Sequence, residues 1–154
     1  MAIGEICSRE VVFVGRDESV AAAARLMREN HVGCLVVAED QDGKRVPAGM
    51  LTDRDITVAV VAPGLDADAI LVGDVMSAEV LSVSDDAGIA EVVELMRVRG
   101  IRRLPVTDAD GALVGLIAAD DILSLLAEEI AGLAGMVSRE EKHERVARKT
   151  RVSA

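Results

Sequence analysis

Apolar residues in the first part of the chain occur in two patterns, short continuous runs and a spacing of three to four residues, and each pattern predicts a different element. Val11–Val14 is a short apolar run before a polar turn, which is typical of a buried strand. After Ser19, a favourable N-cap residue, apolar positions recur three and four residues apart and predict an amphipathic helix. Two further apolar runs, Cys34–Ala38 and Pro47–Thr52, predict strands, and Asp53–Val61 predicts a second helix. The predicted order is β-α-β-β-α.

The second part of the chain repeats the first with an offset of 69 residues. Ile6–Glu39 aligns with Val75–Asp108, and eleven of these 34 aligned positions carry the same residue. The offset then becomes 66, so that Gly49–Ile56 aligns with Gly115–Ile122. The three residues lost between the two offsets fall in a Gly/Asp turn, where changes of length are tolerated. The sequence therefore predicts the order β-α-β-β-α twice.

This pattern predicts an α/β (α+β) fold in which two pseudo-symmetric β-α-β-β-α repeats pack sheet to sheet, with a C-terminal helical extension. Repeat 1 is expected to occupy residues 1–62, a linker residues 63–74, repeat 2 residues 75–128, and the C-terminal helix with a basic tail residues 129–154. Apolar residues spaced three to four apart between Ile122 and Val137 predict that helix. Three roles remain open for this region: packing against its own domain, forming a dimer, or contacting a nucleic acid or membrane through the tail.

Composition and charge narrow the class of protein. Half of the 154 residues are hydrophobic, and Phe13 is the single aromatic residue, so a globular fold with an aliphatic core is expected. The net charge of −10 disfavours nucleic-acid and anionic-membrane partners for the molecule as a whole. Two cysteines, no long apolar run and charged residues near the N-terminus indicate neither secretion nor membrane insertion. A cytoplasmic location is therefore expected.

Several motifs, in the same order in both halves, carry a resemblance to a known family. They are Leu26–Arg28 (LMR), Gly49–Ile56 (GMLTDRDI), Val75–Ser77 (VMS), Leu95–Arg97 (LMR) and Gly100–Val106 (GIRRLPV). Over about residues 3–128 the chain resembles the tandem cystathionine-β-synthase (CBS) domain pair, or Bateman module, of the stand-alone bacterial type. The resemblance implies a regulatory module that binds AMP, ADP, ATP or S-adenosylmethionine between the repeats. It also implies a homodimer, a separate regulated protein and no obligatory cofactor.

The sequence Thr52-Asp53-Arg54-Asp55 is the main candidate binding motif. Thr52 ends a predicted strand and Asp55 falls in the first turn of the next helix, where unpaired backbone N–H groups suit a phosphate. The Thr52 hydroxyl can donate to a ligand oxygen, and Arg54 can pair with phosphate. The resemblance implies that Asp55 accepts hydrogen bonds from a ribose diol. The alternative is an ordinary helix N-terminus that Thr52 caps.

The second copy of this motif has changed. Ala118 stands at the position of Thr52 and lacks the hydroxyl, and Asp120 stands at the position of Arg54 with the opposite charge. Asp121 keeps the carboxylate. Two unlike sites are therefore predicted. We expect the first to dominate and the one around Asp121 to be weak, empty or suited to a less negatively charged ligand.

Two arginines and an apolar wall complete the predicted site. Arg102 and Arg103 stand at the entry to a strand, where they can pair with phosphate or form a surface or inter-subunit salt bridge. Because the chain has almost no aromatic residues, adenine is expected to contact backbone groups and aliphatic side chains. The candidates for this wall lie in Val12–Val14 and Val32–Leu35, among them Val14, Val32, Gly33 and Cys34, and in the second copy in Leu81–Val83 and Ile101–Leu104.

The sequence gives little indication of metal binding or catalysis. His31 and Cys34 have a plausible spacing for a metal pair but lack a third and fourth ligand, so no metal is expected. Cys34 has no matching His/Asn arrangement, and Ser8 and Ser77 lie in no nucleophile motif, so no catalytic residue is assigned. No disulfide between Cys7 and Cys34 is expected. The competing function is a ligand-free dimerisation or adaptor protein.

Overall fold

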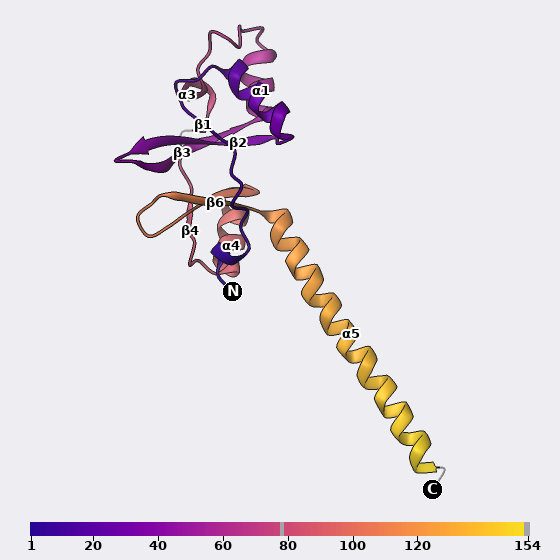
Figure 1. Ribbon diagram of the computed structural model, residues 1–154. Helices are drawn as coiled ribbons and strands as arrows, with labels where there is room; N and C mark the ends of the chain where they lie inside the picture. The colour runs from indigo at the N-terminus through magenta and orange to yellow at the C-terminus, as the bar shows by residue number, and fades with distance from the viewer. Residues whose placement is uncertain (78, 153–154) are drawn as a thin grey trace. The chain divides into compact units, whose positions relative to one another are not determined.

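The computed structural model describes residues 1–77 and 79–152, with side chains described up to Glu140. The chain divides into two compact units, Met1–Ala119 and Asp120–Ala154. Within the described part of the first unit lie two three-stranded sheets, in the orders β1-β2-β3 and β4-β5-β6 (Figure 1).

The first sheet has its longest strands in a hairpin. β1 (Phe13–Val14) runs parallel to β2 (Cys34–Gln41), which pairs antiparallel with β3 (Lys44–Thr52). α1 (Val20–Asn30) connects β1 to β2. The β2–β3 hairpin extends further than predicted, because Asp42 and Gly43 both have positive φ and close a two-residue turn at its tip.

The second sheet repeats this arrangement and confirms the predicted tandem fold. β4 (Val83–Ser84) runs parallel to β5 (Arg103–Thr107), which pairs antiparallel with β6 (Leu113–Ala118). α4 (Ile89–Arg99) connects β4 to β5. β3 and β6 contact each other, so the sheets meet as expected. β1 and β4, the strands that precede α1 and α4, have two residues each and are shorter than predicted.

The two connecting helices begin and end at equivalent positions with different residues. Ser19 caps α1 by accepting a hydrogen bond from Ala22 N at 3.1 Å, whereas Gly88 precedes α4 without a side-chain cap. α1 ends at His31 with φ 55°, and α4 ends at Gly100 with φ 64°. Glycine adopts this left-handed conformation readily, whereas histidine adopts it at a cost.

The segment preceding each repeat pairs with the other repeat. η1 (Ile3–Glu5) is tied to the second repeat by Ile3 N, which donates to Ala87 O at 2.9 Å. At the equivalent place α3 (Val72–Val75) is tied to the first repeat by Val72 N, which donates to Glu18 O at 2.8 Å. Each repeat is thus completed by the segment in front of its counterpart.

After η1 the chain runs alongside the edge strand β6, and after α3 it runs alongside the edge strand β3. In both places it passes close to a glycine of that strand. Ser8 exchanges two 2.9 Å backbone hydrogen bonds with Leu116 on β6, and Ser77 N donates to Met50 O on β3 at 2.9 Å. A Cβ at Gly49 would lie 2.6 Å from Ser77 O, and one at Gly115 would lie 2.5 Å from Cys7 Sγ. These two glycines therefore permit a backbone approach that any side chain would obstruct.

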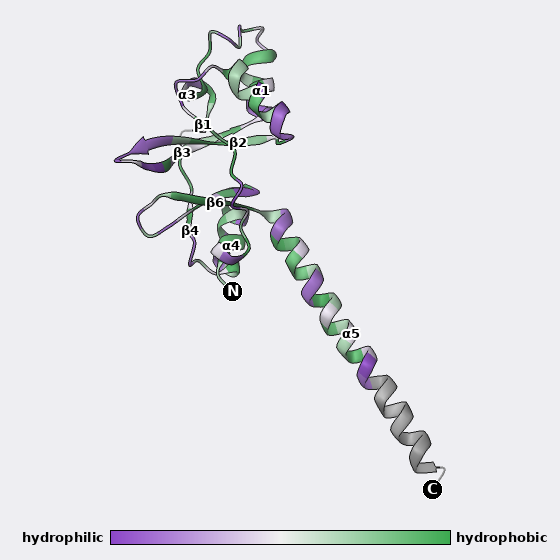
Figure 2. Ribbon diagram, viewed as in Figure 1, coloured by the Kyte–Doolittle hydropathy of each residue, from purple (hydrophilic) through white to green (hydrophobic). Residues whose placement is uncertain are grey.

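The core of the first repeat is aliphatic, as the composition predicts. Its members come from α1, all three strands, the helical segment after β3 and the exchanged α3. They include Val14, Val20, Met27, Leu35, Val37, Leu51, Val60 and Val72. Burial of each such side chain is worth about 1.5–3 kcal/mol, so Val72 secures the exchanged segment against the first repeat. Figure 2 shows the apolar residues along the strands of both sheets.

The predicted helices after β3 and β6 differ in form. After β3, α2 (Asp53–Ile56) continues into the π-helical turn η2 (Thr57–Val61). After β6, α5 (Ala119–Val152) is one continuous 34-residue helix that covers both the predicted end of repeat 2 and the predicted extension. No helix in the described residues combines the length and apolar character that crossing a bilayer requires.

Candidate functional site

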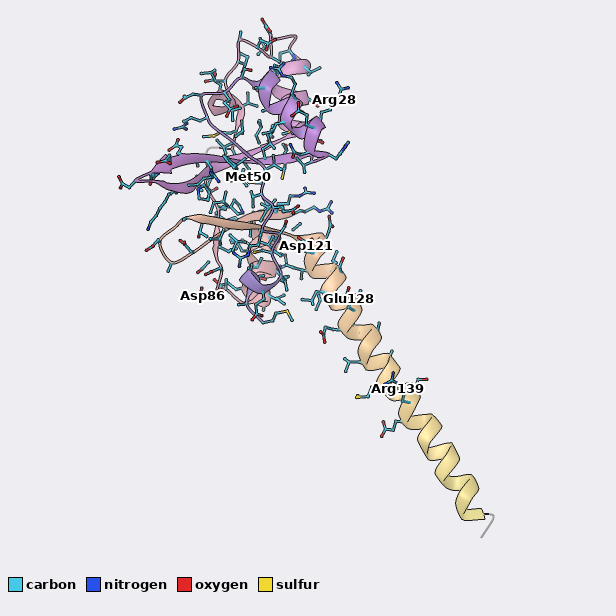
Figure 3. The ribbon with its side chains drawn as sticks, viewed as in Figure 1. Arg28, Met50, Asp86, Asp121, Glu128 and Arg139 are labelled. Atoms are coloured by element: carbon cyan, nitrogen blue, oxygen red, sulfur yellow. The ribbon has the colours of Figure 1, made fainter. Side chains whose placement is uncertain are left out.

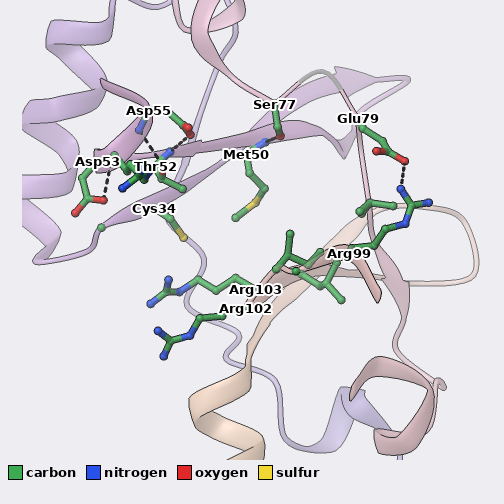
Figure 4. A pocket seen from close by; sticks show the side chains of 16 residues that line it. Cys34, Met50, Thr52, Asp53, Asp55, Ser77, Glu79, Arg99, Arg102 and Arg103 are labelled. Carbon is green, nitrogen blue, oxygen red and sulfur yellow. Dashed lines mark hydrogen bonds and ion pairs between the residues drawn. The ribbon is translucent and has the colours of Figure 1, made fainter. Parts of the chain in front are cut away.

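A cleft of about 620 Å³ opens within the first unit, and we call it the larger cleft. Its walls combine the start of β2, the end of β3 and α2 with the segment before β4 and the junction of α4 with β5 (Figure 4). Its lining residues are Gly33, Cys34, Met50, Thr52, Asp53, Arg54, Asp55, Ser77, Glu79, Leu81, Arg99, Gly100, Ile101, Arg102, Arg103 and Leu104.

The start of α2 is capped by reciprocal hydrogen bonds at the wall of this cleft. Asp55 N donates to Thr52 Oγ1 at 3.1 Å, and Thr52 N donates to Asp55 Oδ2 at 2.8 Å. The next two N–H groups also have partners, because Asp53 N donates to Gly33 O at 3.0 Å and Arg54 N to Asp53 Oδ1 at 2.8 Å. The prediction that unpaired N–H groups here receive a phosphate is therefore wrong. The cap satisfies them instead.

Capping leaves Thr52 and Asp55 able to contact a ligand. The Thr52 hydroxyl acts as an acceptor in the cap and retains its own proton for donation. The cap occupies Oδ2 of Asp55, and Oδ1 takes no part in it. Both residues are half-buried at the cleft. The cap therefore holds the two side chains in fixed positions for hydrogen bonding.

The larger cleft is lined by four arginines and three carboxylates. They are Arg54, Arg99, Arg102 and Arg103, and Asp53, Asp55 and Glu79. Arg99 is engaged with Glu79 in an ion pair at 2.6 Å. In Figure 4 the side chains of Arg102 and Arg103 extend in the same direction, away from that ion pair. The remaining arginine, Arg54, lies beside the α2 cap. The three arginines other than Arg99 are the candidates for holding an anion.

Cys34 contributes a neutral wall to the cleft. Burial raises the pKa of its thiol, the Arg103 guanidinium opposes this effect, and the Asp53 carboxylate adds to it. The thiol therefore stays protonated at neutral pH and behaves as a small apolar group. Both cysteines of the chain are free thiols.

A smaller cleft of about 220 Å³ lies at the equivalent place in the pseudo-symmetry. Its lining residues are Glu10, Val12, His31, Val32, Gly33, Cys34, Arg103 and Leu116. Six of them correspond, at the repeat offset of 69, to residues of the larger cleft: Glu79, Leu81, Gly100, Ile101, Arg102 and Arg103. Arg103 and Leu116 correspond, at the offsets of 69 and 66, to Cys34 and Met50. The described residues thus form two equivalent clefts of unequal size.

The two clefts carry different side chains at equivalent positions. His31 in the smaller cleft stands where Gly100 stands in the larger one, whereas Arg102 in the larger cleft stands where Gly33 stands in the smaller one. Gly33, Cys34 and Arg103 line both clefts. The sequence predicted two unlike sites from Ala118 and Asp120, and the linings of the two clefts differ at His31 and Gly100 as well.

Most predicted site residues lie in the larger cleft: Gly33, Cys34, Thr52, Arg54, Asp55, Arg102 and Arg103. Val32 lines the smaller cleft. Val14 lines neither, since its side chain is buried in the core beside Val20 and Val37. Asp121 lies in the first turn of α5, in the second unit, and its role in a second site stays a prediction.

The exchanged segment also lines the site, which the sequence pattern did not lead us to expect. Ser77 and Glu79 line the larger cleft, and Met50 N donates to Ser77 Oγ at 3.1 Å. A signal for them was present, because Ser8 and Glu10 repeat these residues at the offset of 69. Among the described residues, no group of three or more His, Cys, Asp or Glu is placed to hold a metal ion.

Comparison with known proteins gives several matches. The family model described as CBS domain matches residues 3–62 and 72–128. Hypoxic response protein 1 of Mycobacterium tuberculosis is 36% identical over 124 residues, covering 80% of this chain and 84% of that protein. MK0525, an uncharacterized protein of Methanopyrus kandleri, is 35% identical over 125 residues, covering 81% of this chain. This chain spans only 62% of the length of MK0525.

Solved structures share the fold. A crystal structure of Hypoxic Response Protein I with two coordinated zinc ions has a TM-score of 0.70 and 34% identity, covering 80% of this chain and 98% of that one. The CBS domain pair of MJ0100, in complex with 5′-methylthioadenosine and S-adenosyl-L-methionine, has a TM-score of 0.71 and covers 84% of this chain and 98% of that one. At 22% identity the second likeness concerns the fold alone.

Proposed function

Because the chain belongs to the family of CBS-domain proteins, we propose that it is a regulatory module that binds an adenosyl ligand in the larger cleft. The ligand class comprises AMP, ADP, ATP and S-adenosylmethionine-like molecules. The module acts by binding and not by catalysis. It forms a homodimer, and a separate partner protein responds to its ligand.

The observation that carries this proposal is the reciprocal Thr52–Asp55 cap at the wall of a cleft that also contains several arginines. A ribose diol needs an acceptor for two O–H groups, which the Asp55 carboxylate supplies. A phosphate needs charged donors, which Arg102 and Arg103 supply. The volume of about 620 Å³ lies within the range of small-molecule sites.

The balance of charge in the cleft favours ligands with few phosphates. Four arginines face three carboxylates, and Glu79 already neutralises Arg99. The three remaining arginines stand with Asp53 and Asp55, so their combined charge is +1. The phosphate of AMP, at about −2, already exceeds this charge, and each further phosphate adds anionic charge that these residues do not balance. Within the ligand class we therefore favour AMP and ADP over ATP.

The cleft lends itself to signalling because both repeats line it. Thr52 and Asp55 belong to the first repeat, and Arg102 and Arg103 belong to the second. A ligand that contacts both groups binds best when the repeats stand at one particular separation. This difference in affinity between conformations shifts their populations, which a partner protein can detect.

The proposal is tested by thermal melting of the full chain with AMP, ADP, ATP, NAD and S-adenosylmethionine. A ligand at 100 times its dissociation constant should stabilise the chain by about 2.7 kcal/mol. A clear rise of the melting temperature with one or more adenosyl compounds supports the proposal. Melting unchanged by every compound, at concentrations up to several millimolar, would favour the adaptor function instead.

A matched pair of variants locates the site. Asp55→Asn keeps a side-chain oxygen that can accept from Thr52 N, so the cap persists while the anionic acceptor for ribose is lost. Asp86→Asn makes the same change outside both clefts (Figure 3). Titration calorimetry should show weaker ligand binding for Asp55→Asn only. Equal affinity in both variants would refute the assignment of Asp55.

A further inference from the structure

We propose that α5 pairs antiparallel with α5 of a second copy of this chain, through a stripe of apolar side chains between residues 123 and 137. This interaction does not depend on ligand binding. The stripe comprises Leu123, Leu126, Ile130, Leu133 and Val137, and we call it the α5 seam. These residues are between 45% and 66% exposed, although all are large and apolar.

The spacing of the seam matches helix pairing. Successive members are separated by three, four, three and four residues, the alternation that keeps one face of a helix against a partner helix. The opposite face carries mostly small and polar residues, including Ser124, Glu128, Ala131, Gly135 and Ser138. Ala127 and Ala134 flank the seam, and their small side chains permit a second helix to approach closely. The sequence thus places the main apolar face of this stretch along the seam.

The helix also needs the stability that a partner provides. Gly132 and Gly135 lie inside α5, where a Cβ would meet nothing within 4 Å, and glycine stabilises a helix less than alanine does. Most helical stability in proteins comes from packing of an apolar face. Covering the seam supplies this packing and removes its apolar surface from water.

Charge decides the direction of the pairing. Residues 119–130 contain four acidic residues and no basic one, whereas residues 139–151 contain six basic and three acidic residues. Glu128 and Arg139, labelled in Figure 3, belong to these two charged stretches. Parallel pairing would place the acidic ends together and the basic ends together. Antiparallel pairing places each acidic end beside the basic end of the other copy, which is electrostatically favourable.

The spacing also specifies a register. In an antiparallel pair, Leu126 faces Val137 of the second copy when Ile130 faces Leu133 of the second copy. Leu126 and Val137 lie eleven residues apart on one helix, which is roughly 16 Å at a rise of 1.5 Å per residue. A disulfide can therefore join these two positions in an antiparallel pair but not in a parallel pair.

The test mixes two single variants of the full chain, Leu126→Cys and Val137→Cys, under mild oxidation. The expected product is a disulfide-linked dimer containing one copy of each variant, identified by the mass of its tryptic peptides. The unmodified chain controls for Cys7 and Cys34, which are both buried. Predominant linking of Leu126→Cys to itself would show parallel pairing and overturn the proposal, as would no linking above the level of the unmodified chain.

A matched pair of charges tests whether the seam drives the linking. Ile130→Glu, added to both cysteine variants, places a carboxylate within the seam and should lower the yield of the mixed dimer at least about tenfold. Ala131→Glu places the same charge one residue away, off the seam, and should leave the yield unchanged. Equal yields of the mixed dimer with both substitutions would show that the α5 seam is not the contact between the two helices. Circular dichroism verifies that each variant retains its folded repeats.

Discussion

Cys34 and Arg103 occupy equivalent positions at the starts of β2 and β5, and each lines both clefts. The pseudo-symmetry therefore exchanges a small neutral thiol for a long cation at the boundary between the two clefts. Each cleft therefore contains one thiol and one guanidinium from this pair, at exchanged positions. The two clefts share these side chains, so their unequal volumes have another origin.

Arg103 is predicted to hold the anionic part of the ligand. Replacing it in Arg103→Ala removes a charge-assisted hydrogen bond, worth about 1.5–3 kcal/mol, so affinity for AMP or ADP should fall about ten- to hundredfold. Titration calorimetry measures the change. Arg28→Ala, which removes an exposed cation on α1, serves as the control and should bind as the unmodified chain does (Figure 3). A similar loss in both variants would point to a general effect of net charge instead.

His31 is predicted to limit the smaller cleft and to strain the end of α1. His31→Gly restores the residue found at the equivalent Gly100, relieves a left-handed backbone worth about 1 kcal/mol, and enlarges the smaller cleft. The variant should unfold at a higher denaturant concentration. Titration calorimetry should detect stronger binding at a second site.

The reverse change supplies the control for that prediction. Gly100→His places a side chain at a backbone φ of 64° and into the wall of the larger cleft. It should lower both stability and affinity. The two substitutions should change the free energy of unfolding in opposite directions. Any other outcome would contradict the assignment of backbone strain to these positions.

The pKa of the Cys34 thiol is predicted to depend on its two charged neighbours, Arg103 and Asp53. Because burial raises its pKa, alkylation by iodoacetamide in a Cys7→Ser background should require a higher pH than alkylation of an exposed thiol. Arg103→Ala removes the cation that favours the thiolate, so it should raise the pKa further. Asp53→Asn removes the opposing anion and should lower the pKa. Shifts in the same direction for both variants would be inconsistent with this geometry.

The same thiol makes a contribution to stability that depends on pH. Its pKa in the folded chain lies above the value for an unfolded chain, so the contribution is fully present at neutral pH. It is lost as pH rises through the folded pKa, because the unfolded chain gains the thiolate first. Urea unfolding at increasing alkaline pH should show a smaller loss of stability in Cys34→Ala than in the unmodified chain.

Gly49 is predicted to be indispensable for the exchange of segments. In Gly49→Ala the new Cβ would meet the backbone oxygen of Ser77 at 2.6 Å, and relieving this overlap should cost about 1–3 kcal/mol. In Gly115→Ala the nearest atom is Cys7 Sγ, a side-chain atom that can rotate away, and the nearest backbone atom, Ser8 O, lies further off at 3.0 Å. Denaturant unfolding should therefore rank Gly49→Ala as the less stable variant. The opposite order would show that the exchanged segments adapt differently.

The sequence by itself determined the fold class and the doubling of the chain. Continuous apolar runs, and apolar residues spaced three to four apart, are local properties of the 34 aligned positions, since they depend only on residues close together in the chain. They were sufficient to place α1, β2 and their counterparts. The same local information identified Thr52 and Asp55, because a capping pair is made by residues three apart.

Only the tertiary structure decided which segments complete each repeat and which residues form the clefts. The pairing of Ser8 with Leu116, and of Ser77 with Met50, joins residues far apart in the chain, and no local period encodes it. No local period indicates that Glu79 lines the larger cleft or that it forms an ion pair with Arg99 there. The difference between His31 in the smaller cleft and Gly100 in the larger one likewise matters only once the repeats face each other.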